Sequence, residues 1–270
     1  MALVRNALRV MVRGVVVCGV VVCAVISACA PAPPTIAPEP VRTAAAPSAQ
    51  PSTPPPPRVV VLDPGHNARN AANPAEINRP VPDGRGGTKA CNTTGTQTDA
   101  GYPEHAFTFD VAQRVQRQLE AAGVRVVMTR PDDNGIGPCV DVRGQAGEQA
   151  GADAVVSIHA DGTARNGTGF HVAVSDPPLN PAQEGPARAL ATALRDAMRG
   201  GGFTDSSYTG HEGISLRRDL AGLNLATRPA ALVECGNMRN PAEAALMTTE
   251  PGRERYAAAL ASGVLAFLRR

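Results

Sequence analysis

The stretch Arg58–His66 reads RVVVLDPGH and decides the fold class. Its first five residues are mostly apolar and β-branched, and the turn signal Asp63-Pro64-Gly65 follows them directly. A short apolar run that ends in such a turn is typical of a strand buried on both faces of a sheet. The stretch therefore predicts a buried strand with a polar residue, His66, just beyond its carboxyl end.

Three further apolar runs resemble this one, and each follows a segment with helical character. The runs are Val124–Met128, Ala154–Ile158 and Ala230–Val233, and the preceding segments are Glu104–Ala122, Val140–Ala150 and the stretch around Leu220–Ala226. Buried strands that alternate with amphipathic helices indicate an α/β sheet covered on both faces. Phe170–Val174 suggests an added antiparallel strand, and Ala187–Met198 and Arg253–Leu268 have helical periodicity. We therefore predict a single α/β domain over residues 58–270.

The segment Asn67–Pro103 differs from the rest of this domain because it is rich in Asn, Gly, Thr and Pro. A loop of this length inside a compact domain is often functional. Its turn signals, Asp83-Gly84 and Thr94-Gly95, predict that part of it forms a polar hairpin.

Residues 1–29 have the pattern of an export signal. Arg5, Arg9 and Arg13 precede an apolar run over Val15–Ile26. This run is shorter than the roughly 17–25 residues that a membrane-spanning helix needs. The run ends in Ile26-Ser27-Ala28-Cys29, which resembles a lipoprotein signal in which Cys29 is lipidated, and ordinary cleavage after Ala28-Cys29-Ala30 is the alternative.

Residues 30–57 predict a disordered tether. Eleven of the prolines lie in residues 31–57, so we expect an extended spacer without helix or sheet. The chain as a whole carries a formal net charge of +2, which argues against both a strongly basic nucleic-acid binder and an acidic solvating protein. We expect an exported monomer in the bacterial periplasm or cell envelope, attached to the membrane if Cys29 is lipidated.

Polar residues gather where the predicted strands end. His66 follows the first strand, His159 and Asp161 follow the strand over Ala154–Ile158, and Glu234 follows Ala230–Val233. A fourth candidate, Glu104, opens the predicted helix after the long loop. Ligand sites of open α/β sheets lie beyond the carboxyl ends of the strands. Two imidazoles and a carboxylate can hold a hydrolytic zinc that keeps one position open, which would leave Glu234 free to act as a base.

Each of these residues also has a structural interpretation when taken alone. A histidine at a strand end is commonly a hydrogen-bonded loop residue. An acid in the first turn of a helix commonly interacts with the helix dipole, and Glu104 opens the predicted helix Glu104–Ala122. The metal hypothesis gains its weight from the convergence of several such residues on one rim of one sheet.

The order of motifs resembles that of the zinc-dependent N-acetylmuramoyl-L-alanine amidases of the amidase-3 type. The matching residues are Val61–His66, Glu104, Met128–Arg130, Arg143, Ser157–Asp161, Leu232–Asn237 and Asn240. The resemblance covers about residues 58–270. It implies one domain with a mostly parallel, phosphorylase/hydrolase-like sheet of about six strands flanked by helices. It also implies zinc ligands His66, Glu104 and His159, with Glu234 as the catalytic carboxylate.

The implied reaction is hydrolysis of the amide between N-acetylmuramic acid and L-alanine in peptidoglycan or its fragments. The sequence departs from the family pattern in four places. Asn67-Ala68 replaces glycines, the segment between His66 and Glu104 is longer, Asp161 stands where Asn is common, and Cys235–Met238 replaces a more apolar turn. A hairpin in the longer segment could line or cover the substrate groove.

Several other polar residues are candidates for contacts in or near the site. His211, in a Gly-rich loop, is a candidate substrate contact, and Arg143 is either a substrate clamp or a structural ion-pair partner. His105 lies beside Glu104 on the helix, so the two side chains point apart. Alternation along Phe170–Val174 places His171 on the solvent face. Asp63 is expected to fix the turn or support the ligands.

Three cysteines remain after export, because Cys18 and Cys23 leave with the signal and Cys29 is lost or lipidated. An oxidising compartment favours disulfides. Cys235 follows a predicted strand and should be buried, whereas Cys91 and Cys139 lie in loops. We therefore predict a disulfide between Cys91 and Cys139.

Three alternative functions stay open at this stage. A zinc peptidase that cuts within the stem peptide would use the same metal chemistry. A non-catalytic peptidoglycan-binding lipoprotein would lack a ligand or Glu234, and all four residues are present. A two-carboxylate glycosidase using Glu104 and Glu234 would leave His66 and His159 without a role.

Overall fold

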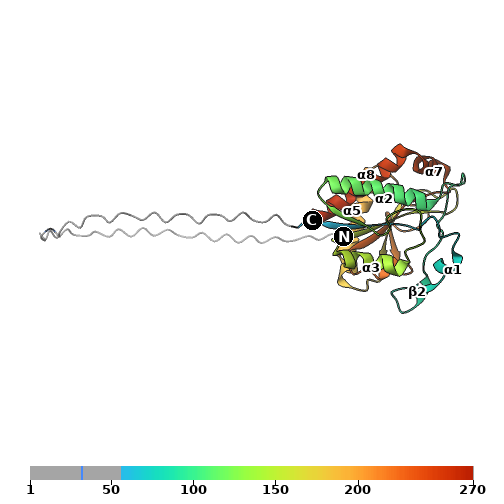
Figure 1. Ribbon diagram of the computed structural model, residues 1–270. Helices are drawn as coiled ribbons and strands as arrows, with labels where there is room; N and C mark the ends of the chain where they lie inside the picture. Colours follow the sequence, from blue (N-terminus) through green and yellow to red (C-terminus); the bar gives the residue numbers. More distant parts are fainter. Residues whose placement is uncertain (1–31, 33–55, 270) are drawn as a thin grey trace, which may run out of the picture. The chain divides into compact units, whose positions relative to one another are not determined.

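The computed structural model describes residue 32 and residues 56–269 (Figure 1). The predicted signal peptide over residues 1–29 and nearly all of the predicted tether over residues 30–57 lie outside the described residues. Across the described part of the chain, no helix combines the length and apolar character needed to cross a bilayer.

The centre of the domain is a six-stranded sheet in the order β4-β1-β5-β8-β6-β7. Its strands are β1 (Val59–Pro64), β4 (Arg125–Met128), β5 (Ala154–Asp161), β6 (His171–Ser175), β7 (Ile214–Arg217) and β8 (Ala230–Asn237). Neighbouring strands are parallel except for β6 and β8, which run antiparallel. The sheet confirms the predicted α/β class and the mostly parallel arrangement.

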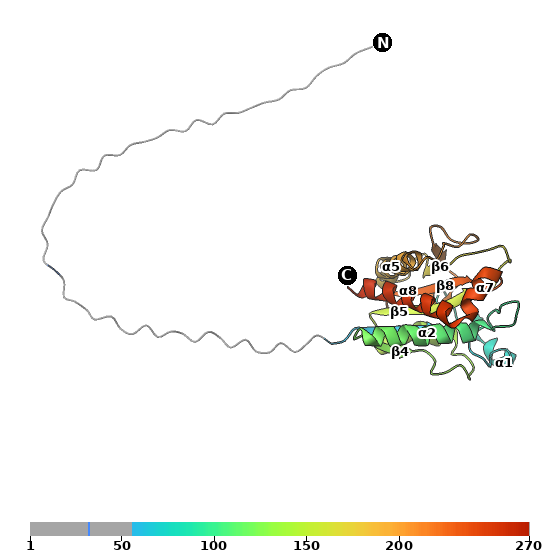
Figure 2. The same ribbon diagram turned by 90° about the horizontal axis from the view of Figure 1, so that it is seen from above.

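Helices cover both faces of the sheet, but unequally. The long helices α2 (Glu104–Ala121), α5 (Pro186–Gly200) and α8 (Glu250–Leu268) lie together on one face, as Figure 2 shows. The opposite face carries α3 (Val140–Ala150) and the short α6 (Ala221–Asn224) (Figure 1). The remaining helices are α1 (Pro74–Ile77), α4 (Pro181–Glu184) and α7 (Pro241–Thr248). The α3 face therefore has the thinner cover.

Alternation along the strands decides which side chains reach that thinner face. In β5, Val156 and Ile158 point into the large core beneath α2, α5 and α8. Ser157 and His159, which alternate with these two residues along the strand, therefore point toward the α3 face. His159 pairs with Glu234 across β5 and β8, so the two side chains leave the same face of the sheet side by side.

Most helices and strands of the structure were predicted from the sequence, but some were not. The predicted helix over Val140–Ala150 coincides with α3, and the strand over Ala154–Ile158 extends to Asp161 in β5. Strand β7 and the short helices α1, α4 and α7 were not predicted. These elements are short, so they offer too few turns or alternations for a periodic signal.

The predicted hairpin is present in the long polar segment. Strands β2 (Pro80–Pro82) and β3 (Thr88–Ala90) pair antiparallel. Asp83 closes the turn between them, because its Oδ1 accepts hydrogen bonds from the backbone N–H groups of Arg85 and Gly87. The Arg85 guanidinium donates to the carbonyl oxygen of Arg218 and thereby ties the hairpin to the segment between β7 and α6.

A disulfide joins Cys91 to Cys139, as predicted. Both half-cystines are buried in a small cluster with Val81, next to the hairpin. The bond links the residue that follows β3 to the residue that precedes α3. Among the cysteines that the structure describes, Cys235 is unpaired and buried, which also agrees with the prediction.

We predict that the double substitution Cys91→Ala/Cys139→Ala lowers the free energy of unfolding by about 2–4 kcal/mol, because the unfolded chain loses a constraint across 48 residues. Urea unfolding of both proteins should show this difference without reductant. Addition of reductant should lower the stability of the wild type and leave that of the variant unchanged. Equal stabilities without reductant would contradict the prediction.

Candidate active site

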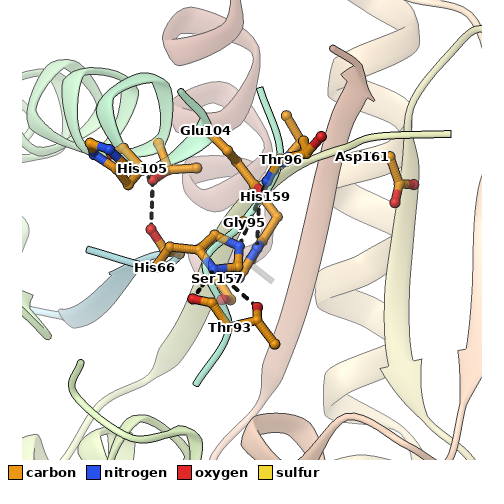
Figure 3. Close-up of polar contacts among 12 residues, drawn as sticks. His66, Thr93, Gly95, Thr96, Glu104, His105, Ser157, His159 and Asp161 are labelled. Atoms are coloured by element: carbon orange, nitrogen blue, oxygen red, sulfur yellow. Dashed lines mark hydrogen bonds and ion pairs between the residues drawn. The ribbon is translucent and has the colours of Figure 1, made fainter. Parts of the chain in front are cut away.

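Three side chains from distant parts of the chain converge at the rim of the sheet (Figure 3). His66 follows β1, Glu104 is the first residue of α2, and His159 lies in β5. His66 Nε2 lies 3.1 Å from Glu104 Oε2, and His159 Nδ1 lies 3.0 Å from Glu104 Oε1. One ligand atom from each residue fits within a 4.8 Å cluster, which is the arrangement needed to bind one metal ion.

The surroundings of His66 orient its ring for a ligand role. Its Nδ1 lies 3.1 Å from the carbonyl oxygen of Thr93, which can only accept, so Nδ1 carries a proton and Nε2 is the nitrogen that faces Glu104 and the candidate metal position. The backbone of His66 has a φ of 57°, in the left-handed region that disfavours residues other than glycine. Strain of this kind collects at functional sites and needs surrounding contacts to hold it.

The Glu104 carboxylate is buried yet anionic. Backbone N–H groups of Thr96 and Ala160 donate to its two oxygens at 2.9 and 3.1 Å. Burial alone would raise the pKa of Glu104, but His66 and His159 hold it well below its usual range. Two imidazole nitrogens and a carboxylate oxygen are the donor set of many catalytic zinc sites, so these residues fit zinc.

A buried ion pair supports the strand end below this cluster. Asp63 accepts hydrogen bonds from Arg143 Nη1 at 2.6 Å, Ser157 Oγ at 2.7 Å and Thr129 Oγ1 at 2.6 Å. Arg143 Nη2 also donates to the carbonyl oxygen of His66 at 2.8 Å. Arg143 is only 5% exposed, and this geometry favours its structural interpretation over that of a substrate clamp.

We predict that Asp63→Asn lowers the free energy of unfolding at pH 7 by about 3–5 kcal/mol, because Arg143 loses its buried partner. Burial would raise the pKa of Asp63, but Arg143 and the hydroxyl donors lower it to about 2. A depressed pKa contributes stability that is present above about pH 4 and is lost as the pH falls toward 2.

Urea unfolding between pH 7 and pH 2 should therefore show a steeper acid loss in the wild type than in Asp63→Asn. Asp153→Asn is the control, because Asp153 lies just before β5 and pairs with the exposed Arg58. An Asp63→Asn variant as stable as this control at pH 7 would refute the assigned role.

Gly65 allows the His159 ring to pack directly on the backbone. A Cβ built on Gly65 would lie 2.3 Å from His159 Cε1, which is too close for any side chain. The glycine is thus required by the position of a candidate ligand, and the Pro64-Gly65 turn serves the site as well as the fold.

We predict that Gly65→Ala keeps the fold but weakens Zn²⁺ binding roughly 10–100-fold, because it displaces the His159 ring. Far-UV circular dichroism and titration calorimetry with Zn²⁺ would measure the two effects. Gly185→Ala is a matched control, since a Cβ on Gly185 meets nothing within 4 Å. Equal affinities for Zn²⁺ in the two variants would contradict the prediction.

Glu234 lies next to the ligand cluster, at the register position beside His159. Its Oε2 is buried without a hydrogen-bond partner among the described residues. Burial raises the pKa of Glu234 well above its usual range, and the negative charges of Asp161 and Glu104 raise it further. A carboxylate in such surroundings is suited to take up and release a proton.

These residues line one cavity of about 380 Å³ on the α3 face. Its polar end holds the three candidate ligands, Asp161 and Glu234, and its apolar end runs along Val155 and Leu232 toward α6. The segment that carries the hairpin forms part of the wall through Lys89 and Thr93–Thr96. The longer segment between His66 and Glu104 therefore lines the groove, as its length led us to expect.

Two other histidines lie outside this cluster. His105 turns away from it, and its Nδ1 lies 2.6 Å from Asp133 Oδ2. His211 is exposed in the loop before β7 and is not among the residues that line the cavity. Its role in substrate contact stays a prediction.

The prediction for His171 was wrong. His171 is 1% exposed, and its Nε2 lies 2.9 Å from Asp161 Oδ2. Alternation failed because β6 lies between β8 and β7 and every residue of the strand is buried. Tyr208, in the loop before β7, reaches the same Asp161 oxygen with its hydroxyl at 2.9 Å. Sequence analysis missed Tyr208, because a tyrosine in a Gly- and Ser-rich loop carries no periodic signal.

The geometry defines a class of protein: an α/β domain with a His/Glu/His cluster that could hold a metal ion and a separate carboxylate at the sheet rim. The Amidase_3 family, described as N-acetylmuramoyl-L-alanine amidase, matches residues 60–266. The chain belongs to this family of peptidoglycan amidases, which confirms the resemblance and the predicted class of hydrolase.

Individual relatives agree with this assignment. The chain is 50% identical over 210 residues to the N-acetylmuramoyl-L-alanine amidase Rv3717 of Mycobacterium tuberculosis, which covers 78% of this chain and 86% of that protein. The crystal structure of the amidase Ami1 from Mycobacterium smegmatis matches with a TM-score of 0.76 and 50% identity, covering 78% of this chain and 97% of the other. Ami1 from Mycobacterium abscessus matches with a TM-score of 0.76 and 51% identity, covering 78% and 98%.

Proposed function

We propose that this protein hydrolyses the amide between N-acetylmuramic acid and L-alanine in peptidoglycan or its fragments, with zinc held by His66, Glu104 and His159. The main support is the position of Glu234, which lies beside the three-residue cluster inside one cavity. Zinc held at such a site would polarise the scissile carbonyl and lower the pKa of its bound water toward about 7.

The side chains of this site divide the work of amide hydrolysis. His66, Glu104 and His159 would bind the metal, and hydrogen bonds with Thr93, Thr96 and Ala160 hold the first two of them in position. Glu234 would take the proton from the attacking water and deliver it to the amide nitrogen as the carbon–nitrogen bond breaks. Its unpartnered Oε2 and raised pKa support this shuttle, because both make the carboxylate a good proton acceptor.

We predict that Glu234→Gln retains zinc but lowers turnover of muramyl dipeptide at least ~100-fold, because general acid–base catalysis contributes roughly 10²–10⁴-fold. Metal analysis and detection of the released amine would measure both properties. His66→Ala should instead lose the metal. Glu148→Gln is the control, because Glu148 is exposed and pairs with Arg228.

The same assay separates the amidase from the alternative stem-peptide peptidase. An amidase releases a peptide that begins with the amine of L-alanine, whereas a peptidase frees an amine within the stem. Near-wild-type turnover by Glu234→Gln would refute the role of Glu234, and a new amine within the stem would refute the amidase.

We also infer that the protein is exported as a monomer. The positive residues and apolar run of residues 1–29 support a signal peptide, and the prolines of residues 30–57 support a tether to the catalytic domain over residues 58–270. Lipidation of Cys29 would then hold the enzyme at the membrane surface, within reach of the cell wall. Metabolic labelling with a fatty acid, compared with a Cys29→Ser variant, would test the anchor.

A further inference from the structure

The Asp161 carboxylate lies at the cavity beside Glu234 and has no part in the mechanism described above. Its Oδ2 faces His171 Nε2 at 2.9 Å and accepts a hydrogen bond from the Tyr208 hydroxyl, also at 2.9 Å. The side chain is 32% exposed and lines the cavity. Both bonds that the described residues make to this carboxylate end on one oxygen, so Oδ1 is left for a donor inside the cavity.

The two partners hold the Asp161 carboxylate in one orientation. Burial raises the pKa of Tyr208 well above its usual range, and Asp161 raises it further, so the hydroxyl keeps its proton and donates. His171 is fixed by its burial in β6, and its ring packs edge-on against Tyr208 with 6.2 Å between centroids. A carboxylate held in this way loses little freedom when a ligand binds.

The position of this group follows from the register of three neighbouring strands. Glu234 in β8 pairs with His159 in β5 on one side and with His171 in β6 on the other. Adjacent strands lie about 4.8 Å apart, so these three side chains form a row on one face of the sheet. The candidate metal ligand is at one end of the row, the proposed proton carrier is in the middle, and the His171–Asp161 pair is at the other end.

Amide hydrolysis develops positive charge on the leaving nitrogen. The carbonyl carbon gains a bond to the water oxygen and loses its bond to nitrogen, and the water proton passes through Glu234 to the nitrogen. The nitrogen already carries one hydrogen, so it leaves as a neutral amine. The second proton of the water, released by the new carboxylic acid, then converts the amine to an ammonium and leaves a carboxylate as the other product. An anionic acceptor beside the leaving nitrogen would stabilise this developing positive charge.

We propose that Asp161 Oδ1 accepts the N–H of the scissile amide and then holds the α-ammonium of the released peptide, with His171 and Tyr208 as positioning residues. This inference rests on the proposed function, because that function supplies the amide. It assigns the far end of the row to the leaving nitrogen and makes Asp161 a determinant of specificity for secondary amides, which keep an N–H to donate.

Binding of the amine product tests the proposal without turnover. The probe is L-alanyl-D-isoglutamine, compared with its N-acetyl derivative, titrated into the full-length, zinc-loaded protein by calorimetry. Asp161→Asn preserves the shape of the side chain and removes its charge. It should weaken binding of the free amine roughly 10–100-fold, the range for a charge-assisted hydrogen bond, and leave binding of the acetylated peptide unchanged.

Asp153→Asn is the matched control. Asp153 directly precedes the same strand at the opposite end of the sheet, and its side chain is 29% exposed, close to the value for Asp161. This variant should bind both peptides as the wild type does. Tyr208→Phe should weaken binding of the amine in the same direction by a smaller factor, roughly 3–10-fold, because Asp161 keeps its charge and loses only one of the two contacts that position it.

Two results would overturn the proposal: an unchanged affinity of Asp161→Asn for the amine, or an equal loss for both peptides. The second result would show general damage to the groove. Failure of the proposed function has a different signature, because the zinc-loaded wild type would then release no amine from muramyl dipeptide. The comparison of peptide affinities between the variants does not depend on that outcome.

Discussion

The buried ion pair between Asp63 and Arg143 is the interaction on which the site depends. Asp63 lies at the end of β1, and its three donors come from β5, from the segment after β4 and from α3. The other hydrogen bonds of Arg143 go to backbone carbonyl oxygens, including those of Pro64 and His66. A lone buried charge would be costly, but a pair whose remaining polar atoms are all used fixes the geometry around it. The pair therefore holds the strained His66 backbone in place.

A second buried arginine reinforces the same turn from the other face of the sheet. Arg130 donates to the carbonyl oxygens of Pro64 and Gly65 and to that of His105 at the start of α2. Because α2 begins with Glu104, this contact couples the position of one candidate ligand to the turn that carries another.

Much of this arrangement could be predicted from sequence, because the signals are local and periodic. The apolar runs of β1 and β5 end in the polar residues that meet at the rim, so topology alone brings His66 and His159 together. The role of Glu104 was harder to predict from the sequence. Its place depends on the path of the preceding polar segment, and only the family resemblance assigned it. The position of His171 was mispredicted, since a strand buried on both faces has no outward side for alternation to reveal.

Because β6 runs antiparallel to β8, the rim carries more polar side chains than a purely parallel sheet would place there. In a parallel sheet only carboxyl ends meet at the ligand-binding edge. Reversal of β6 brings its first residue, His171, to that edge opposite Glu234. The shift in register between His159 and Asp161 places one extra residue in β8, so that Asp161 pairs with Asn237. Because His159 and Asp161 are two residues apart in β5, their side chains leave the same face of the sheet. The reversal of β6 and this alternation place the Asp161–His171 pair beside Glu234, so the second polar centre is a consequence of the sheet's topology.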